Sequence, residues 1–252
     1  MAAFYREDKR ISKYIPSERG QMVIHPFNSR KENYISEETL PAKSKEWLSA
    51  ISHYARNRER YKFLPYNSAL LVIDMQEYFL NEESHAFIPS SKAILPNIKL
   101  LLNTYRTHDL PVFFTRHSLK EDEHPGIMEK WWGDVIKEES VLSEIVPSLN
   151  PTSSENVIRK TRYSAFQGTE LEKFLKQRSV KSVVITGVMT HLCCESTARE
   201  GFMKDYEVYF VVDGTATQNE ELHLSSLRTL SHGFSIPIIT EEILTEFEEM
   251  QR

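Results

Sequence analysis

The sequence has few of the features that stabilise small secreted proteins or anchor membrane proteins. Its two cysteines, Cys193 and Cys194, are adjacent, and neighbouring cysteines rarely form a disulfide, so a disulfide framework is excluded. The longest strictly apolar runs are about five residues, such as 69–73, whereas a helix that spans a bilayer needs about 20. The first residues are charged and contain no apolar core, so we expect no secretory signal. These absences predict a cytoplasmic protein that makes no contact with a membrane.

The composition is that of a folded globular protein. Of the 252 residues, 40% are hydrophobic and 27% are charged, which excludes a disordered chain. A chain of this length corresponds to one large domain or at most two. A domain of this size buries enough surface to fold without a disulfide or a metal.

Charge is distributed unevenly along the chain. Residues 1–65 hold 13 basic and 8 acidic side chains, a net charge of +5, although the whole chain carries −5. We therefore divide the chain into a basic N-terminal arm with one helix, 1–65, and a domain, 66–252. The acidic domain would repel phosphates, so we expect no nucleic-acid partner, and we expect the arm to pack on the domain.

Apolar runs alternate with amphipathic segments from residue 69 onward, which predicts an α/β fold. The apolar runs are typical of strands that are buried on both faces of a parallel sheet. The predicted strands are 69–74, 111–116, 157–160, 182–188, 208–213 and 236–240. The predicted helices are 43–60, 91–108, 169–179, 191–205, 219–233 and 241–250, with a short helix within 127–138. The expected architecture is a three-layer α-β-α sandwich with a mostly parallel sheet of about six strands.

Polar residues follow several of the predicted strands, at the sheet edge where open parallel sheets bind ligands. These residues are Asp74, Arg116, His117, Lys160, 188–193 and Asp213. Asp74 and Lys160 alone would be read as an ordinary buried ion pair, since each compensates the desolvation of the other. Cys193 changes that interpretation. It lies at the start of a predicted helix, where the helix dipole and free N–H groups favour a thiolate and can hold an oxyanion.

Four segments resemble the isochorismatase-like family of cysteine hydrolases, which includes nicotinamidases, carbamoyl-amide hydrolases and isochorismatases. The segments are LLVIDMQEYF (70–79), RKTRYSAFQGTELEKFL (159–175), ITGVMTHLCCESTAREGFMKDYEVYFVVDGTAT (185–217) and HLSSLRTLSHGFSIPIITEEIL (223–244). The resemblance implies that Asp74 is an acid and base, Lys160 organises charge and Cys193 is the nucleophile. It also implies a cis peptide bond between Val188 and Met189, next to an oxyanion site.

Two departures from the family narrow the expected chemistry. Nicotinamidases hold a metal with an Asp-x-His motif, but the matching stretch TRHSLK has His117 and Leu119 at those two positions. We therefore expect no metal and no cofactor, and we read His117 as a hydrogen-bonded residue of the cleft. Several isochorismatases have glycine at the nucleophile position, because hydrolysis of a vinyl ether needs proton transfer rather than a thiolate, yet this chain has Cys193.

Other strings, among them DMQEYF, RYSAF and WWG (131–133), resemble the isochorismatase subgroup. They suggest that the substrate pocket is formed by Phe79, His117, Trp132 and Tyr163, with Met189 beside them. Packing in the core is the alternative role for each aromatic side chain. The specificity of the pocket depends on the irregular segment 117–155, whose path the sequence does not predict.

Four further residues near these motifs carry reactive side chains. His191 is two residues from Cys193, a spacing at which helical side chains do not face each other, so we do not expect a Cys–His dyad. We expect Cys194 to be an inert core thiol, and His223 and His232 to lie at the surface or at an interface of a helix.

The leading hypothesis is a metal-free cysteine hydrolase that cleaves a C–N bond of a small amide or carbamoyl compound. The second hypothesis is an isochorismatase, and a non-catalytic interaction scaffold is the third. The intact set of Asp74, Lys160 and Cys193 argues against the scaffold. We expect a small-molecule substrate and, from the family resemblance, a homo-oligomer that is a dimer or larger.

Overall fold

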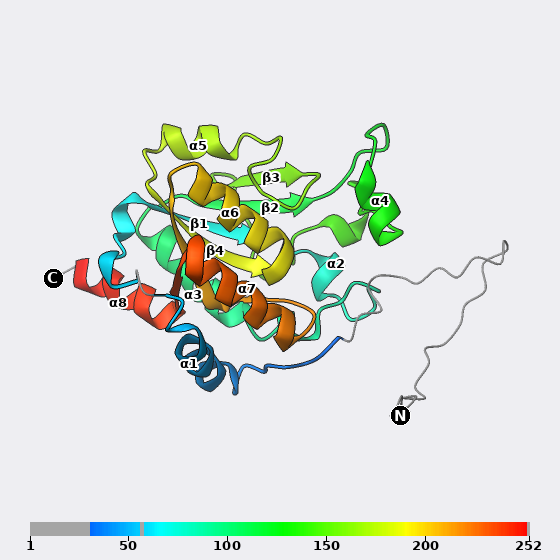
Figure 1. Ribbon diagram of the computed structural model, residues 1–252. Coiled ribbons are helices and arrows are strands. Elements are labelled where there is room, and N and C mark those ends of the chain that lie inside the picture. The colour runs from blue at the N-terminus through cyan, green and yellow to red at the C-terminus, as the bar shows by residue number, and fades with distance from the viewer. Residues whose placement is uncertain (1–30, 56–57, 251–252) are drawn as a thin grey trace, which may run out of the picture.

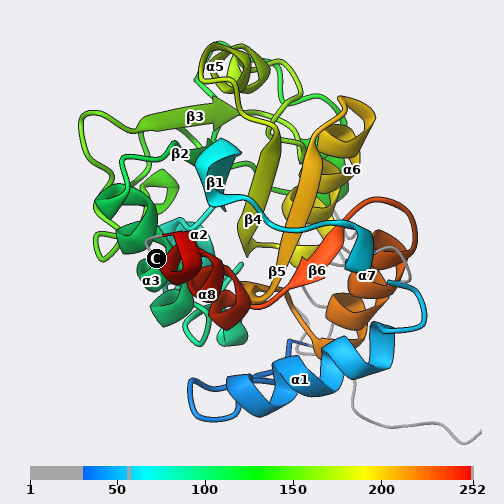
Figure 2. The same cartoon turned by 90° about the vertical axis from the view of Figure 1, so that its left-hand side faces the viewer.

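A six-stranded, all-parallel sheet forms the centre of the computed structural model, which describes residues 31–55 and 58–250. The strand order is β3-β2-β1-β4-β5-β6 (Figures 1 and 2). The strands are β1 (Ser68–Ile73), β2 (Val112–His117), β3 (Asn156–Lys160), β4 (Ser182–Val188), β5 (Glu207–Ala216) and β6 (Ile236–Ile238). Every residue of β1 and β4 is buried, as expected of central strands that are covered on both faces. The α/β prediction is thereby confirmed.

Eight α-helices within the described residues surround this sheet. They are α1 (Leu40–Ile51), α2 (Glu77–Leu80), α3 (Leu95–Thr107), α4 (Ile127–Trp132), α5 (Leu171–Gln177), α6 (Glu195–Met203), α7 (Glu220–Gly233) and α8 (Thr240–Met250). The helices α3 and α8 cover one face, and α5, α6 and α7 cover the other (Figures 1 and 2). None of the helices in this described part of the chain is long and apolar enough to cross a membrane.

The chain leaves the centre of the sheet in two directions, which determines where a site can form. After β1 it adds β2 and β3 on one side, and then returns to add β4, β5 and β6 on the other. The order therefore reverses between the neighbouring strands β1 and β4, and open α/β sheets bind ligands beyond the carboxyl ends of strands at such a point. The helices α2 and α4 lie beyond the arrowheads of the strands, next to this edge (Figure 1).

Several element boundaries differ from the predicted ones. The first helix begins at Leu40, with Pro41 in its first turn where a missing N–H costs nothing, and it ends at Ile51 rather than at residue 60. The segment predicted as one helix over 191–205 begins with a π-helical turn, Thr190–Cys194, before α6. Strand β5 continues to Ala216, three residues beyond its predicted end, after a register shift against β4.

The described part of the N-terminal segment packs onto the domain. Trp47 of α1 is 2% exposed, its indole nitrogen donates to Glu220 at 2.8 Å, and its ring lies 4.4 Å from that of His223. His223 is fully buried and its Nδ1 lies 3.0 Å from the hydroxyl of Thr190, so of its two predicted places, the surface or an interface of the helix, the structure shows the interface. Helix α1 covers it. The domain boundary at residue 65 stays a prediction, and residues 1–30 of the expected arm lie outside the described residues.

Gly187 allows β1 and β4 to approach each other beside the carboxyl ends of the strands. Its φ is +108°, and a Cβ atom there would lie 2.0 Å from the carbonyl oxygen of Ile73. We expect Gly187→Ala to lower the free energy of unfolding by about 3 kcal/mol or more, measured by urea denaturation. Gly168→Ala is the matched control, because φ is +67° but nothing lies within 4 Å, and it should cost only about 1–2 kcal/mol. Equal effects of the two changes would contradict the steric argument.

His223 should make the stability of the protein depend on pH. Burial lowers its pKa to about 3, below the value of about 6.5 in an unfolded chain. The folded state therefore excludes a proton that the unfolded state binds, so stability is full above pH 6.5 and falls as the pH falls toward 4. We expect His223→Gln to reduce this slope by about 1.4 kcal/mol per pH unit, measured by urea denaturation between pH 6 and 4. His232→Gln changes an exposed histidine of the same helix and is the matched control, and an equal change of slope in both variants would contradict the effect of burial.

Candidate active site

Asp74 follows β1 at the point where the strand order reverses. Its φ of +47° lies in the left-handed region, which aspartate tolerates better than most residues. The carboxylate is fully buried, and its Oδ1 accepts a hydrogen bond of 2.6 Å from the hydroxyl of Thr115 on the neighbouring strand. The same hydroxyl accepts a 3.0 Å hydrogen bond from the Asp74 backbone N–H. These two bonds fix the direction of the carboxylate.

Lys160 is the last residue of β3, two strands away from Asp74, and its long side chain reaches across β2. Its Nζ lies 2.7 Å from Oδ2 of Asp74, and both side chains have no exposed surface. The ammonium also donates to the carbonyl oxygen of Arg162 at 3.0 Å and to the sulfur of Cys193 at 3.3 Å. Burial alone would lower the pKa of Lys160, but attraction to Asp74 and Cys193 outweighs burial and raises it. The lysine is therefore a fixed cation.

Cys193 lies in the π-helical turn that follows β4, and it is 5% exposed. Burial raises the pKa of its thiol to about 12; the Lys160 charge opposes this rise and Asp74 adds to it. The helix start favours a thiolate, whereas burial in the folded chain disfavours it. In the free protein this residue is a thiol beside a carboxylate.

The backbone turns sharply between β4 and Cys193. The peptide bond between Val188 and Met189 is cis. The carbonyl oxygen of Met189 accepts hydrogen bonds from the N–H groups of Leu192 at 3.0 Å and Cys194 at 3.2 Å. Val188 is buried inside the strand, whereas Met189 reaches the cavity described next.

The sulfur of Cys193 faces a narrow cavity of about 50 Å³. The sequence-predicted residues Phe79, His117, Tyr163 and Met189 line it, and so does Trp132, whose indole nitrogen donates to the Tyr163 hydroxyl at 2.7 Å. Pockets for small molecules usually measure about 300–1,000 Å³, so this cavity is smaller than a typical binding pocket. The structure thus brings the predicted side chains together at one cavity.

Several residues that position this site were not singled out from the sequence. Besides Thr115, Gln76 holds the backbone of His117: its Nε2 donates to the His117 carbonyl at 3.0 Å, and its Oε1 accepts from the His117 N–H at 2.8 Å. The sequence contained a signal for Thr115 and Gln76, since both are polar residues within or next to the apolar runs that predict strands. The remaining cavity residues are Tyr78, Met128, Asp134, Val135, Ile136 and Leu192. Most of these belong to the irregular segment whose path the sequence did not predict.

Other candidates lie outside the cavity. Arg116 turns away toward the carboxylate of Glu144, 2.9 Å distant, and Asp213 accepts two 2.9 Å hydrogen bonds from Thr240. The Nδ1 atom of His191 lies 2.6 Å from the Thr217 hydroxyl. Cys194 is fully buried, as predicted, and its sulfur points to a backbone carbonyl of β4.

The donor atoms near Cys193 do not fit a metal site. Among the described residues no three histidine, cysteine or acidic side chains are placed to share a metal ion. Leu119, at the position of a family ligand, is buried and supplies no donor atom.

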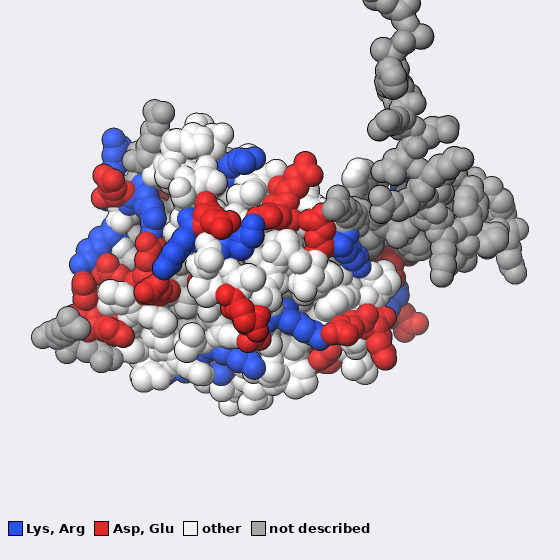
Figure 3. Space-filling view, turned by 90° about the horizontal axis from the view of Figure 1, so that it is seen from below, with Lys and Arg blue, Asp and Glu red and all other residues white. Residues whose placement is uncertain are grey.

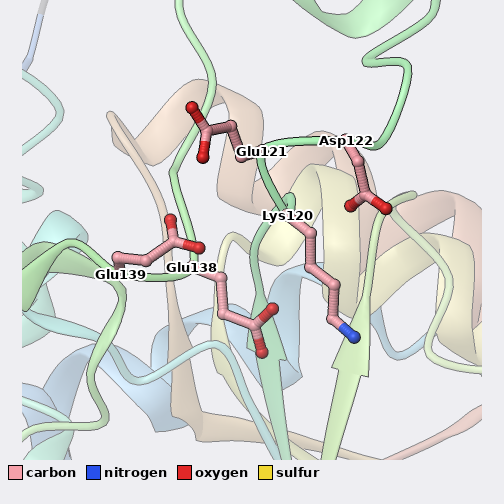
Figure 4. A pocket seen from close by; sticks show the side chains of 5 residues that line it. All are labelled: Lys120, Glu121, Asp122, Glu138 and Glu139. Carbon is pink, nitrogen blue, oxygen red and sulfur yellow. The ribbon is translucent and has the colours of Figure 1, made fainter.

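A larger surface hollow of about 510 Å³ lies away from this cavity (Figure 4). It is lined by Lys120, Glu121, Asp122, Glu138 and Glu139, and their carboxylates point in several directions. No cysteine lines this hollow. On the face shown in Figure 3, acidic and basic side chains of the described residues are interspersed, without an extended patch of one sign.

Asp74, Lys160 and Cys193 thus lie together at the carboxyl edge of a parallel α/β sheet. Residues 68–242 match the model of the isochorismatase domain, and the chain therefore belongs to the isochorismatase family of hydrolases. It is 42% identical to Nicotinamidase 3 of Arabidopsis thaliana over 171 residues, covering 67% of this chain and 82% of that protein. It is 31% identical to Enterobactin synthase component B of Escherichia coli (strain K12), covering 75% of this chain and 66% of that protein. A solved cysteine hydrolase from Pseudomonas syringae pv. phaseolicola 1448A superposes with a TM-score of 0.72 at 25% identity, covering 75% of this chain and 96% of that chain.

The ionisation of Cys193 tests the electrostatics of the site. We expect its thiol to titrate far above neutral pH, and Asp74→Asn to shift that titration to lower pH, because the nearby carboxylate disfavours a thiolate. The difference in ultraviolet thiolate absorbance between each protein and its Cys193→Ser counterpart gives the titration. Cys194→Ser serves as the control for the second thiol. A wild-type midpoint for Cys193 below about 8.5 would contradict the effect of burial.

Proposed function

We propose that the protein hydrolyses a C–N bond of a small carboxamide or carbamoyl compound through a thioester on Cys193. The observation that carries this proposal is the contact of the Cys193 sulfur with Lys160, which is itself paired with Asp74, at the wall of a cavity. A nucleophile, a proton acceptor and a fixed cation are the groups that acyl transfer requires. The similarity to a nicotinamidase supports an amide as the substrate.

The proposed reaction begins when a substrate carbonyl carbon lies above the sulfur. Asp74 takes the thiol proton as the S–C bond forms, so the thiolate exists only during attack, in accord with the raised pKa of Cys193. Lys160 stabilises the negative charge on the Asp74 carboxylate and on the sulfur of Cys193. Asp74 then gives the proton to the leaving nitrogen, the C–N bond breaks, and an amine or ammonia departs from the thioester.

In hydrolysis of the thioester, water is the attacking group and the Cys193 sulfur is the leaving group. Asp74 takes a proton from a water molecule while the oxygen adds to the thioester carbon, and the C–S bond breaks to release the acid. The departing sulfur recovers its proton from Asp74. We propose that backbone N–H groups around Met189 and Cys193 hold the oxyanion in both steps, since such donors, when preorganised, stabilise the tetrahedral intermediate.

A second candidate function is hydrolysis of a vinyl ether such as isochorismate. The raised pKa of Cys193 favours it, because that reaction needs only proton transfer from Asp74 and no thiolate. The similarity to Enterobactin synthase component B is compatible with it. Under this alternative, Cys193 would be dispensable.

For either reaction we propose a small-molecule substrate held by Phe79, His117, Trp132 and Tyr163, which line the cavity. We also propose that the chain forms a homo-oligomer. The apolar side chains of Ile127 and Trp131 on α4 are 63% and 66% exposed, and such a surface is typical of an interface.

The two candidates are separated by the fate of Cys193 variants. For the thioester route we expect wild-type protein to release ammonia from nicotinamide, and Cys193→Ala to lower kcat/KM at least about 10³-fold. Hydroxylamine should divert the thioester to the hydroxamate, detected by mass spectrometry. Asp74→Asn should lower kcat by about 10²–10⁴-fold, because the proton acceptor is lost.

Cys194→Ala is the matched control, since its sulfur lies outside the cavity. It should keep activity within about 3-fold of wild type, because it changes one buried methylene-sized group. Release of pyruvate from isochorismate at the same rate by wild type and Cys193→Ala would sink the thioester route and support the alternative.

A further inference from the structure

The π-helical turn that carries Cys193 is held by side-chain hydrogen bonds from two other elements. The hydroxyl of Thr190 lies 3.0 Å from Nδ1 of His223 on α7. At the next residue, Nδ1 of His191 lies 2.6 Å from the hydroxyl of Thr217, which directly follows β5. Helix α7 and the end of β5 therefore support the first two residues of this turn.

Tyr34, from the segment before α1, contacts both supports. Its hydroxyl oxygen accepts a 3.0 Å hydrogen bond from the backbone N–H of Thr217. The centroid of its ring lies 5.8 Å from that of His223. Trp47 completes the cluster, with its ring 6.0 Å from Tyr34 and 4.4 Å from His223. One side chain of the N-terminal segment thus reaches the two residues that hold the turn.

The backbone around Tyr34 is itself attached to the domain. The Tyr34 N–H donates to the hydroxyl of Ser90 at 3.1 Å, and that hydroxyl donates to the carbonyl oxygen of Glu32 at 3.2 Å. The Glu32 N–H donates to the carbonyl oxygen of Gln218 at 2.8 Å. Helix α1, which follows this segment, packs on α7 and β5 (Figure 2). Tyr34 therefore has a fixed position from which it can hold the turn.

This support comes from outside the part of the chain that matches the isochorismatase domain, residues 68–242. We propose that Tyr34 is a positioning residue, which holds the turn so that the sulfur of Cys193 lies 3.3 Å from Nζ of Lys160. The inference rests on the proposed function only in giving Cys193 the role of nucleophile. Tyr34 does not line the cavity, so it acts on the reaction through the turn.

The Tyr34 hydroxyl is the atom that the proposal makes responsible. Its removal takes an acceptor away from the N–H of Thr217, a residue with no exposed surface. Loss of one hydrogen bond in such a place changes a local equilibrium by about 3- to 10-fold. The end of β5 then holds His191 less firmly, and the turn opens more often. The sulfur of Cys193, whose thiol pKa is raised chiefly by burial, meets water during each opening.

The test compares Tyr34→Phe with Tyr105→Phe, each made in Cys194→Ser protein so that Cys193 is the one remaining thiol. Phenylalanine keeps the ring and removes only the hydroxyl. Tyr105 is the matched control, because its hydroxyl lies 2.7 Å from that of Ser68. Ser68 begins β1 and so lies at the amino edge of the sheet, opposite the site. Both changes remove one tyrosine hydroxyl with its hydrogen bond.

Alkylation of Cys193 by iodoacetamide at pH 9, followed by intact mass, needs no substrate. We expect Tyr34→Phe to be alkylated about 3- to 10-fold faster than Tyr105→Phe, because the turn opens more often. Urea denaturation gives the share of alkylation that global unfolding contributes in each variant, and this share is subtracted. A corrected rate in Tyr34→Phe that equals or falls below that of Tyr105→Phe overturns the positioning role.

Catalysis supplies the second readout. With a substrate that wild type hydrolyses, we expect Tyr34→Phe to lower kcat about 3- to 10-fold and to leave KM within about 2-fold, since the cavity lining is unchanged. A rise in KM with an unchanged kcat overturns the positioning role. If wild type hydrolyses neither nicotinamide nor isochorismate, the proposed function fails for these compounds. Faster alkylation of Tyr34→Phe than of the control still supports the inference in that case.

Discussion

The buried ion pair between Asp74 and Lys160 is the interaction on which the site depends. Two opposite charges without solvent exposure are tolerated only when they lie close together and their remaining hydrogen-bonding groups are satisfied. Thr115 and the carbonyl of Arg162 supply those remaining bonds. The pair also joins strands that are not neighbours, since β2 lies between β1 and β3. The pair therefore links the carboxyl ends of β1 and β3.

The same pair governs the state of the thiol. Lys160 stabilises negative charge on the sulfur and Asp74 opposes it, while burial disfavours a thiolate altogether. The result is a site in which charge develops only when a proton can move between Cys193 and Asp74. The small size of the cavity suits this arrangement, because bulk water would weaken every charge interaction inside it.

Predictions from the sequence succeeded where the pattern was local. The apolar runs located all six strands, because a strand covered on both faces must be apolar at nearly every position. The same runs identified Asp74 and Lys160 as the polar residues at strand ends. For His223 the sequence left the surface and an interface open: its helix is amphipathic, and nothing local reveals that Trp47, some 175 residues earlier in the chain, covers its ring. The pKa of Cys193 shows the same limit, since the helix start is visible in the sequence but the loss of water around the sulfur is not.

The sequence by itself determined the parallel α/β sheet, the edge at which a site forms and the family whose residues occupy it. Spacing and residue type carry that information, because strand and helix periodicities and the residues that end each strand are local properties of the chain. Only the tertiary structure decided which polar atoms of the site already have hydrogen-bond partners. The folded chain uses every N–H of Lys160, directs Arg116 toward Glu144 and leaves Nδ1 of His117 without a hydrogen-bond partner among the described residues. Those facts depend on distances between strands and loops that are far apart in sequence, and these distances exist only after the sheet has assembled.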